Sequence, residues 1–392
     1  MERAVILEGA RTPMGRAFKG SFKDTRPEDL LATVLRAAVE KVEGLKPEQI
    51  DDVIIGCAFP EGEQGMNIAR IGVFLAEFPD SVPAMTINRF CSSGSQAIAL
   101  AAQEVLTGFS DIVIAGGVES MTRVKMYGFS YSEHPGLKAN RPDAYMPMGL
   151  TAELVAERCN VSREDQDKFA VRSHERALAA VNSGRFDKRV VPMKVKVSVA
   201  NPDGSTSERE VLVARDEGPR PGTTVEKLAT LKPVFKENGT VTAGNASQMT
   251  DGAAAVVVTT ESKAKELGVK PIAWLGPAVV AGLDPAVMGL GPIFAVPKLL
   301  KKSGLTLDDI DLIELNEAFA SQAVACIRQL GLPEDKVNVN GGAIALGHPL
   351  GATGARLTID LITEMEHRNA KRGIVTMCIG GGQGFAMLVE RQ

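Results

Sequence analysis

GLKPEQIDDVIIG at residues 44–56 and GLTLDDIDLIELN at residues 304–316 are two copies of one pattern. In both copies a Gly-Leu pair follows a helical stretch, a polar turn comes next, and an aliphatic run typical of a buried strand ends the pattern. Gly94 and Gly354 also lie 260 residues apart, and each stands in a small-residue segment that leads into a helix. The two copies indicate a duplicated αβ unit, whose equivalent loops are expected to meet near a pseudo-twofold axis.

Strands and helices alternate on both sides of a middle section that has a different composition. Before residue 119 short aliphatic runs alternate with helical stretches, which is typical of a mainly parallel sheet covered on both faces. The section at about 119–248 holds all three tyrosines, several methionines and a predicted hairpin that turns at 201–204. We therefore predict an N-terminal half at residues 1–267, which contains this inserted loop region, and a C-terminal half at residues 268–392.

The composition is that of an ordinary globular protein. Of 392 residues, 23% are charged and 44% are hydrophobic, and 44 Lys and Arg oppose 48 Asp and Glu. The net charge of −4 gives no electrostatic reason to bind nucleic acid or an anionic membrane, and no apolar run approaches the ~18 residues that a membrane span needs. The first residues resemble a strand rather than a signal peptide, and an odd number of cysteines suits reduced thiols. We expect a cytoplasmic protein without nucleic-acid or membrane partners.

One cysteine stands in the small-residue segment NRFCSSGSQA at residues 88–97. A strand-like stretch precedes Cys91 and an alanine-rich helix follows it, so the thiol is expected at a helix N-terminus, where unpaired N–H groups favour a thiolate. Ser92, Ser93 and Gly94 leave room for a substrate to approach. A buried cysteine that packs as a small hydrophobic side chain would give the same pattern, so this segment alone leaves both interpretations open.

Two further small-residue segments, at residues 340–354 and 376–384, each hold one reactive side chain. His348 precedes Pro349, which keeps it extended, and its small neighbours leave the imidazole free for proton transfer; a structural or solvated histidine is the alternative. Cys378 follows a strand, and the glycines after it allow either a close backbone approach or a glycine hairpin. Three other histidines are expected on the surface: His134, His174 and His367.

In combination, these segments resemble the active-site segments of the thiolase family, and the resemblance covers essentially the whole chain. Four segments match in order: CSSG at 91–94, NEAF at 316–319, the segment 342–349 that begins with GA and ends with HP, and CIGGG at 378–382. GNAS at residues 244–247 resembles the coenzyme A loop of that family. The resemblance implies an α/β protein with a thiolase-like, duplicated αβαβα five-layer fold and an inserted loop domain, in agreement with the internal repeat.

The resemblance also implies a role for each matching residue. Cys91 would be the nucleophile that becomes acylated, His348 would accept its proton, and Cys378 would be the second acid and base. Asn316 would hold a water in one oxyanion hole, and the backbone N–H groups of Cys91 and Gly380 would form the other. Six residues match positions that contact coenzyme A: Met148, Arg220, Phe235, Ser247, Ala318 and Phe319.

The implied activity is that of an acyl-CoA:acetyl-CoA C-acyltransferase, which cleaves a 3-ketoacyl-CoA by thiolysis through an acyl-Cys91 intermediate in a reversible, ping-pong reaction. Pro147 stands where the acetoacetyl-specific biosynthetic members carry His, and it favours the degradative branch that serves fatty acid β-oxidation. A biosynthetic acetyl-CoA C-acetyltransferase is the alternative. From a different class, an inactive module that binds coenzyme A or lipid would be expected to have lost Cys91, His348 or Cys378.

Coenzyme A and acyl-CoA are thus expected as substrates, and no cofactor is expected to stay bound. The four scattered histidines offer no metal-ligand spacing, so no metal is expected either. By resemblance to the family, the chain is expected to form a homodimer or a homotetramer.

Overall fold

The computed structural model describes residues 2–201 and 203–392, whose strands form one ten-stranded sheet and one separate hairpin. The order in the large sheet is β10-β11-β12-β9-β1-β8-β5-β3-β4, and the short β2 pairs with β8. The strands of the first half are β1 (Ala4–Arg11), β2 (Gly15–Arg16), β3 (Asp52–Gly56), β4 (Met85–Ile87), β5 (Ile112–Ser120) and β8 (Thr250–Thr260). Those of the second half are β9 (Ala273–Gly282), β10 (Leu312–Leu315), β11 (Arg372–Ile379) and β12 (Gln383–Glu390).

Helices connect these strands in both halves. The first half contributes α1 (Pro27–Glu40), α2 (Ile68–Leu75), α3 (Ser93–Thr107) and α8 (Glu261–Glu266). The second half contributes α9 (Gly291–Ser303), α10 (Ala320–Leu330), α11 (Ala343–Leu346) and α12 (Leu350–Arg368).

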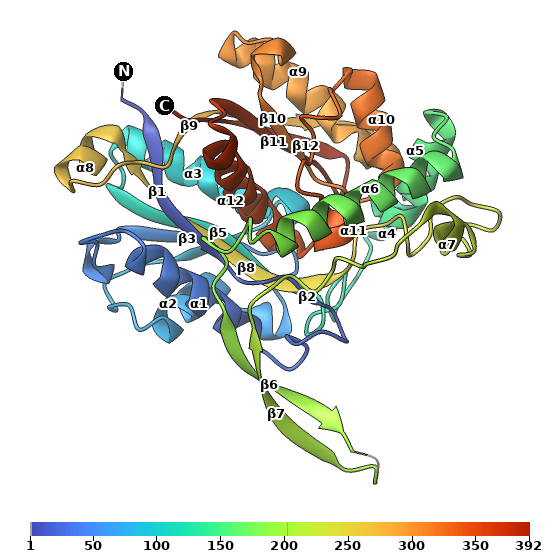
Figure 1. The fold of residues 1–392 in the computed structure, drawn as a ribbon. Helices are drawn as coiled ribbons and strands as arrows, with labels where there is room; N and C mark the ends of the chain where they lie inside the picture. The colour runs from blue at the N-terminus through green and yellow to red at the C-terminus, as the bar shows by residue number, and fades with distance from the viewer. Residues whose placement is uncertain (1, 202) are drawn as a thin grey trace.

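Alternate residues along each strand face different helices, and this alternation defines five layers (Figure 1). Val53 and Ile55 of β3 pack with α1 and α2, whereas Ile54 between them packs with α3 and α12. In the second half Val375 of β11 packs with the same central helices, whereas Ile374 packs with α9 and α10. Helices α3 and α12 therefore lie between two half-sheets, and outer helices cover each half-sheet. The predicted αβαβα order is confirmed.

The two half-sheets are joined along one short edge. Strands β1 and β9 pair at two positions, Val5 with Trp274 and Ile6 with Ala273. Within the sheet β3 pairs in parallel with β4 and β5, and β10 with β11, but the other pairings of the described strands are antiparallel. The prediction of a mainly parallel sheet is wrong, because β12 follows β11 through a tight turn, and such a connection forces antiparallel pairing.

The sequence repeat is also a structural repeat, down to one side chain in each half. Asp51 Oδ2 accepts hydrogen bonds from the main-chain N–H groups of residues 111 and 112, at 2.8 and 2.9 Å. Asp311 Oδ2 accepts from those of residues 371 and 372 at the same distances. Each aspartate thus ties the start of one parallel strand to the start of its neighbour, and the duplication preserves this tie.

The paired glycines Gly94 and Gly354 lie where α3 crosses α12. A Cβ on Gly94 would lie 2.8 Å from main-chain atoms of α12, and a Cβ on Gly354 would overlap the main-chain nitrogen of Ser95. Only glycine allows the two helices to approach this closely. The crossing brings the N-terminal ends of both helices together, with Cys91 and His348 just ahead of them.

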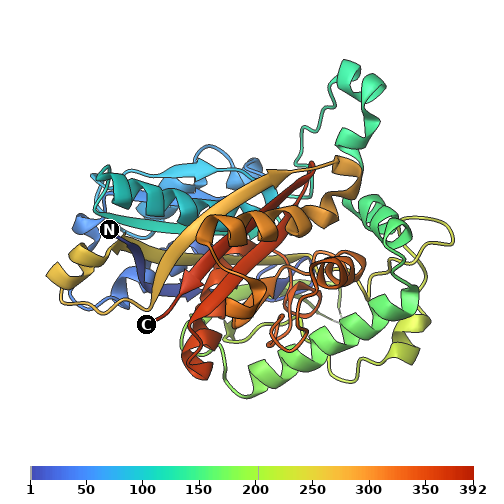
Figure 2. The same ribbon diagram turned by 90° about the horizontal axis from the view of Figure 1, so that it is seen from above.

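The inserted segment leaves the sheet after β5 and returns to it at β8. It contains α4 (Pro135–Asn140), α5 (Met148–Arg158), α6 (Arg163–Asn182), β6 (Met193–Ala200), β7 (Thr206–Val213) and α7 (Val225–Ala229). The predicted hairpin is confirmed as the antiparallel pair β6–β7, which projects from the body of the protein in Figure 1. Viewed from above, α6 runs along the side of the second half, where it packs against α10 and α11 (Figure 2). None of the helices in the described ranges combines the length and the apolar composition needed to cross a membrane.

Gly354→Ala is expected to destabilise the fold, because the added methyl group would push α12 away from α3. Overpacking of this kind typically lowers the free energy of unfolding by about 1–3 kcal/mol, and by more where the added group meets rigid backbone. The midpoint of thermal unfolding should therefore fall by several degrees. Gly304→Asn is the control, since Gly304 has a φ of +68° with open space around its Cα, and Asn tolerates that conformation. Thermal unfolding followed by circular dichroism measures both variants, and an unchanged midpoint for Gly354→Ala would contradict the expected overlap.

Candidate active site

Ends of elements from both halves meet at one place. Cys91 lies in the one-turn helix Phe90–Ser92 immediately before α3, and this turn packs against α12 and β11. His348 lies just before α12, Asn316 follows β10, and Cys378 lies near the end of β11. The structure thus brings together residues that lie far apart in the sequence, at the meeting point of the two repeats.

Cys91 is a buried, neutral thiol. Its side chain is 8% exposed, and the main-chain N–H groups of Gly380 and of Cys91 itself face the sulfur. Burial raises the pKa of the Cys91 thiol to about 12, and the two N–H groups offset only part of this rise. The expectation that the helix N-terminus favours a thiolate is therefore wrong for the protein without bound substrate. Burial removes water from the sulfur, and its effect on the pKa outweighs that of the helix dipole.

The second thiol, Cys378, is fully buried on the other side of the site. Burial raises its pKa well above the usual value, and the nearby Cys91 and Cys326 thiols add to the rise. Cys378 packs in an apolar cluster with Ala318 and Met288. A thiol in this position stays protonated at neutral pH, so it is available as a proton donor.

His348 is held as one tautomer by its neighbours. Its Nδ1 lies 2.6 Å from Thr353 Oγ1, and its Nε2 lies 3.3 Å from Asn316 Nδ2. The Thr353 hydroxyl donates its proton to the carbonyl of Pro349 at 2.9 Å, so it accepts a hydrogen bond from Nδ1–H. The imidazole therefore presents the lone pair of Nε2 toward the site. Burial, with a smaller contribution from Arg356, lowers the pKa of His348 to about 3, so the ring is neutral.

Asn316 has one amide atom paired and one unpaired. Its Nδ2 faces His348, whereas its buried Oδ1 has no hydrogen-bond partner among the described residues. A buried amide oxygen left unpaired costs about 1–3 kcal/mol, and a bound water is the common solution to such a deficit. The polar environment of Asn316 thus fits the water site that the family resemblance implies.

Several of the residues expected to contact coenzyme A form an apolar wall beside Cys378. Met148, Ala318 and Phe319 pack in the same cluster as Cys378. The ring of Phe235 meets that of Phe319 edge-on with centroids 6.2 Å apart. Met148 Sδ would lie 3.6 Å from a Cβ on Gly380, so the wall continues to the backbone that faces Cys91.

The other two residues expected to contact coenzyme A extend this wall outward. Ser247 donates its main-chain N–H to the carbonyl of Ala318 at 3.0 Å. Arg220 is exposed, does not join the apolar cluster, and lies 3.4 Å from Gln248 Oε1 through its guanidinium. An exposed guanidinium suits the charged end of a long ligand.

One histidine differs from its prediction. His134 and His367 are exposed as expected, but His174 is 4% exposed, so its surface assignment is wrong. Its Nδ1 accepts a hydrogen bond from the main-chain N–H of Arg220, and burial, with a contribution from the Arg220 charge, lowers its pKa to about 4. The neighbouring Glu175 is exposed on the outer side of α6, whereas Ser173 and His174 both face inward.

Two buried carboxylates that support the site were missed by the sequence analysis. Glu317 accepts hydrogen bonds from the Ser173 hydroxyl at 2.6 Å and from Asn338 Nδ2 at 2.9 Å, and so ties the inserted helix α6 to the second half. Glu119 makes a similar set of bonds at the end of β5. Both stand in otherwise apolar or small-residue runs, and an acidic residue in such a run is a signal of a buried, hydrogen-bonded carboxylate.

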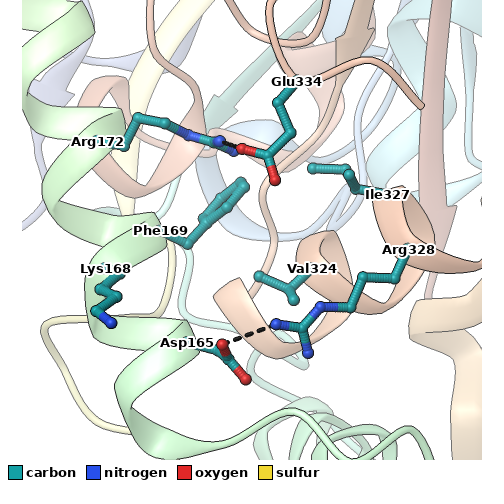
Figure 3. Close-up of a pocket in the computed structure, with 8 residues that line it drawn as sticks. All are labelled: Asp165, Lys168, Phe169, Arg172, Val324, Ile327, Arg328 and Glu334. Carbon is teal, nitrogen blue, oxygen red and sulfur yellow. Dashed lines mark hydrogen bonds and ion pairs between the residues drawn. The ribbon is translucent and has the colours of Figure 1, made fainter. Parts of the chain in front are cut away.

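A cavity of about 270 Å³ lies away from these residues, between α6 and α10 (Figure 3). Four of its five charged side chains pair with one another: Arg328 lies 2.7 Å from Asp165, and Arg172 contacts Glu334. The fifth, Lys168, pairs with Glu164 outside the lining. Its lining residues are Asp165, Lys168, Phe169, Arg172, Val324, Ile327, Arg328 and Glu334. None of them belongs to the segments that meet at Cys91.

The duplicated five-layer fold, with two thiols and an imidazole where its halves meet, defines a class of acyltransferases. Models described as "Thiolase, N-terminal domain" and "Thiolase, C-terminal domain" match residues 4–262 and 269–391. The chain belongs to the thiolase family. The resemblance noted from its motifs is confirmed, and the chain is an enzyme of the acyltransferase type.

Similar proteins match over almost the full length. The 3-ketoacyl-CoA thiolase of Bacillus subtilis is 52% identical over 390 residues, with 100% of both chains covered. The peroxisomal 3-ketoacyl-CoA thiolase 1 of Arabidopsis thaliana is 47% identical and covers 99% of this chain and 87% of its own. Among solved structures, the acetyl-CoA acetyltransferase of Bacillus anthracis has a TM-score of 0.89 at 42% identity and covers 100% of this chain and 99% of its own.

Thr353→Val is expected to slow the reaction of Cys91 with iodoacetamide by about 10–100-fold at pH 7. The substitution removes the oxygen that accepts from Nδ1–H, and loss of such a supporting partner has effects of this size at other sites. Thr353→Ser keeps the hydroxyl and should react at nearly the normal rate. Mass spectrometry of the Cys91 peptide follows the reaction, and equal rates for the two variants would show that Thr353 does not control the imidazole.

Proposed function

We propose that the protein cleaves 3-ketoacyl-CoA with coenzyme A to give acetyl-CoA and an acyl-CoA shortened by two carbons. The proposal depends on one observation: the Cys91 thiol, the Cys378 thiol and the neutral imidazole of His348 belong to one buried site. Relatives that are 47–52% identical over nearly the full chain carry the name 3-ketoacyl-CoA thiolase, which supports this reaction over others of the family.

In the first half-reaction the Cys91 sulfur attacks the C3 ketone, and its proton passes to Nε2 of His348. The bond between C2 and C3 then breaks, and its electron pair forms the enolate of acetyl-CoA. Cys378 donates its proton to C2 of this enolate, which releases acetyl-CoA and leaves the acyl group on Cys91. The main-chain N–H groups of Cys91 and Gly380 would stabilise the negative charge that the attack places on the C3 oxygen, with about 3 kcal/mol per donor in comparable sites.

In the second half-reaction coenzyme A takes the place of acetyl-CoA along the apolar wall. The Cys378 thiolate removes the proton from the coenzyme A thiol, and the resulting sulfur anion attacks the acyl group on Cys91. The carbon–sulfur bond to Cys91 breaks, and His348 returns its proton to the departing thiolate. Both cysteines and the imidazole regain their starting protonation states, so no metal or redox cofactor takes part in the proposed cycle.

The second candidate is a biosynthetic acetyl-CoA C-acetyltransferase specific for acetoacetyl-CoA. One observation favours it: the structural neighbour of Bacillus anthracis is an acetyl-CoA acetyltransferase. The identity to that protein is 42%, lower than the 52% to the 3-ketoacyl-CoA thiolase of Bacillus subtilis. Pro147 immediately precedes Met148, the first residue of α5. The biosynthetic members carry His at this position, so the proline supports tolerance of longer acyl chains.

We also propose that the enzyme acts in the cytoplasm as a homodimer or homotetramer, with halves that divide near residue 267. The five cysteines are free thiols, which suits a reducing compartment. Large apolar side chains such as Met66, Phe74 and Phe109 are exposed, and a subunit contact over them would remove apolar surface from water.

Cys91→Ala is expected to abolish the acyl-enzyme, because no other protein group in the proposed cycle bonds to the acyl carbon. Cys378→Ala should still become acylated at Cys91 by an activated acyl thioester, but it should lose at least 10³-fold in carbon–carbon cleavage, since no acid protonates the enolate (a loss of about 4 kcal/mol or more). Intact-protein mass spectrometry detects the acyl group. Cys159→Ala, at a half-buried cysteine outside the site, should behave normally, and acylation of any other residue would reject the assignment.

The unmodified enzyme is expected to cleave 3-ketooctanoyl-CoA with a kcat/KM at least equal to that for acetoacetyl-CoA. Each methylene group buried in an apolar site stabilises the bound substrate by about 0.8 kcal/mol, so a site that accepts longer acyl chains should bind them more tightly. Release of acetyl-CoA measured with one enzyme preparation compares the two substrates. Cleavage restricted to acetoacetyl-CoA would instead support the biosynthetic candidate.

A further inference from the structure

Glu119 at the end of β5 is a fully buried carboxylate on which several donors converge. It accepts hydrogen bonds from the main-chain N–H of Ala58 at 2.8 Å, from Gln64 Nε2 at 2.7 Å and from the main-chain N–H of Gly351 at 2.8 Å. Two longer bonds come from the main-chain N–H of Phe59 at 3.3 Å and from the thiol of Cys57 at 3.7 Å. Burial raises the pKa of Glu119, and the hydrogen bonds from Ala58, Gly351, Gln64 and Phe59 offset part of this rise. Among the described residues no Lys or Arg forms an ion pair with it, so these dipoles are the main stabilisation of the ionised form.

The donors belong to parts of the chain that come from different halves. Ala58 and Gln64 lie in the loop that follows β3, in the first half. Gly351 lies in the first turn of α12, three residues after His348, in the second half. The carboxylate therefore holds the start of the helix that follows the imidazole against the half of the molecule that carries Cys91.

The first turn of α12 packs closely against neighbouring backbone at Gly351. A Cβ on Gly351 would lie 2.7 Å from the carbonyl oxygen of Val118 and 2.8 Å from Cα of Cys57. The first turn of α12 thus rests directly on the backbone of β5 and of the loop after β3, and the Glu119 bond is the polar part of that contact. A carboxylate at a helix N-terminus is also favoured by the helix dipole.

We propose that Glu119 is a positioning residue that fixes His348 relative to Cys91, and so controls the step in which Cys91 loses its proton. The inference rests on the proposed function for the identity of that step. Glu119 acts on His348 through its bond to the main chain of Gly351, and its charge is also a small contribution to the raised pKa of the Cys91 thiol. A displacement of about 1 Å between two reacting groups can cost 10²-fold in rate, so a clamp of this kind matters for catalysis.

A glutamine cannot replace this carboxylate. Two carboxylate oxygens offer about four acceptor sites, whereas an amide offers one oxygen and two N–H donors that would oppose the converging N–H groups. Glu119→Gln therefore leaves donors unpaired and loosens the first turn of α12. The apolar wall around Met148 and Phe319 does not contact Glu119 and should keep its geometry.

Glu119→Gln is expected to slow acylation of Cys91 in a single turnover by about 10–100-fold, and to slow alkylation of Cys91 by iodoacetamide by a similar factor. The Kd for coenzyme A, measured by titration calorimetry, should stay within twofold of normal. Glu63→Gln is the matched control: Glu63 lies next to Gln64, in the segment that follows β3, but it pairs with Arg123 and not with Gly351, so neither rate should change. A folded Glu119→Gln enzyme with normal rates, or with its loss confined to coenzyme A binding, would overturn the inference.

Gln64→Ala provides a milder test if Glu119→Gln fails to fold. It removes one donor but leaves the carboxylate and its bond to Gly351, so both Cys91 rates should fall several-fold with unchanged affinity for coenzyme A; unchanged rates would count against the inference. The alkylation rate also separates this inference from the proposed function. An enzyme that cleaves no 3-ketoacyl-CoA would refute the proposed function, whereas its Cys91 alkylation would still report whether Glu119 positions His348.

Discussion

The close approach of α3 to α12 is the constraint on which the rest of the structure depends. Gly94 and Gly354 remove the side chains that would keep the helices apart, and each helix then packs between two half-sheets. Cys91 and His348 stand just before the N-terminal ends of these helices, and Asn316 and Cys378 stand at the ends of neighbouring strands. A single helix crossing thus determines both the five-layer architecture and the meeting of Cys91 with His348.

Burial sets the electrostatic character of the site. It raises the pKa of both Cys91 and Cys378 and lowers that of His348, so all three groups are neutral at pH 7. The proposed reaction therefore relies on proton transfer between neutral groups rather than on a stored ion pair. The direction of that transfer depends on the imidazole tautomer, which the hydrogen bonds of Thr353 and Asn316 select.

Some features of this protein could be predicted from local sequence, and others could not. The repeat, the β6–β7 hairpin and the reactive segments were visible because each depends on residues close together in the chain. The antiparallel pairings, the buried state of His174 and the protonated state of Cys91 were predicted wrongly, since each depends on what packs against the segment from elsewhere. Glu119 and Glu317 were missed for the same reason: their hydrogen-bond donors lie far away in the sequence.

The sequence by itself determined that the chain is a duplicated α/β protein of the thiolase family with two cysteines and one histidine in glycine-rich surroundings. These properties depend on residue type and spacing, which the chain carries whether folded or not. Only the tertiary structure decided which groups are charged, which ring nitrogen of His348 is the acceptor, and which carboxylates support the site. Those properties depend on hydration and on hydrogen-bond partners, and both arise when distant segments pack together and exclude water.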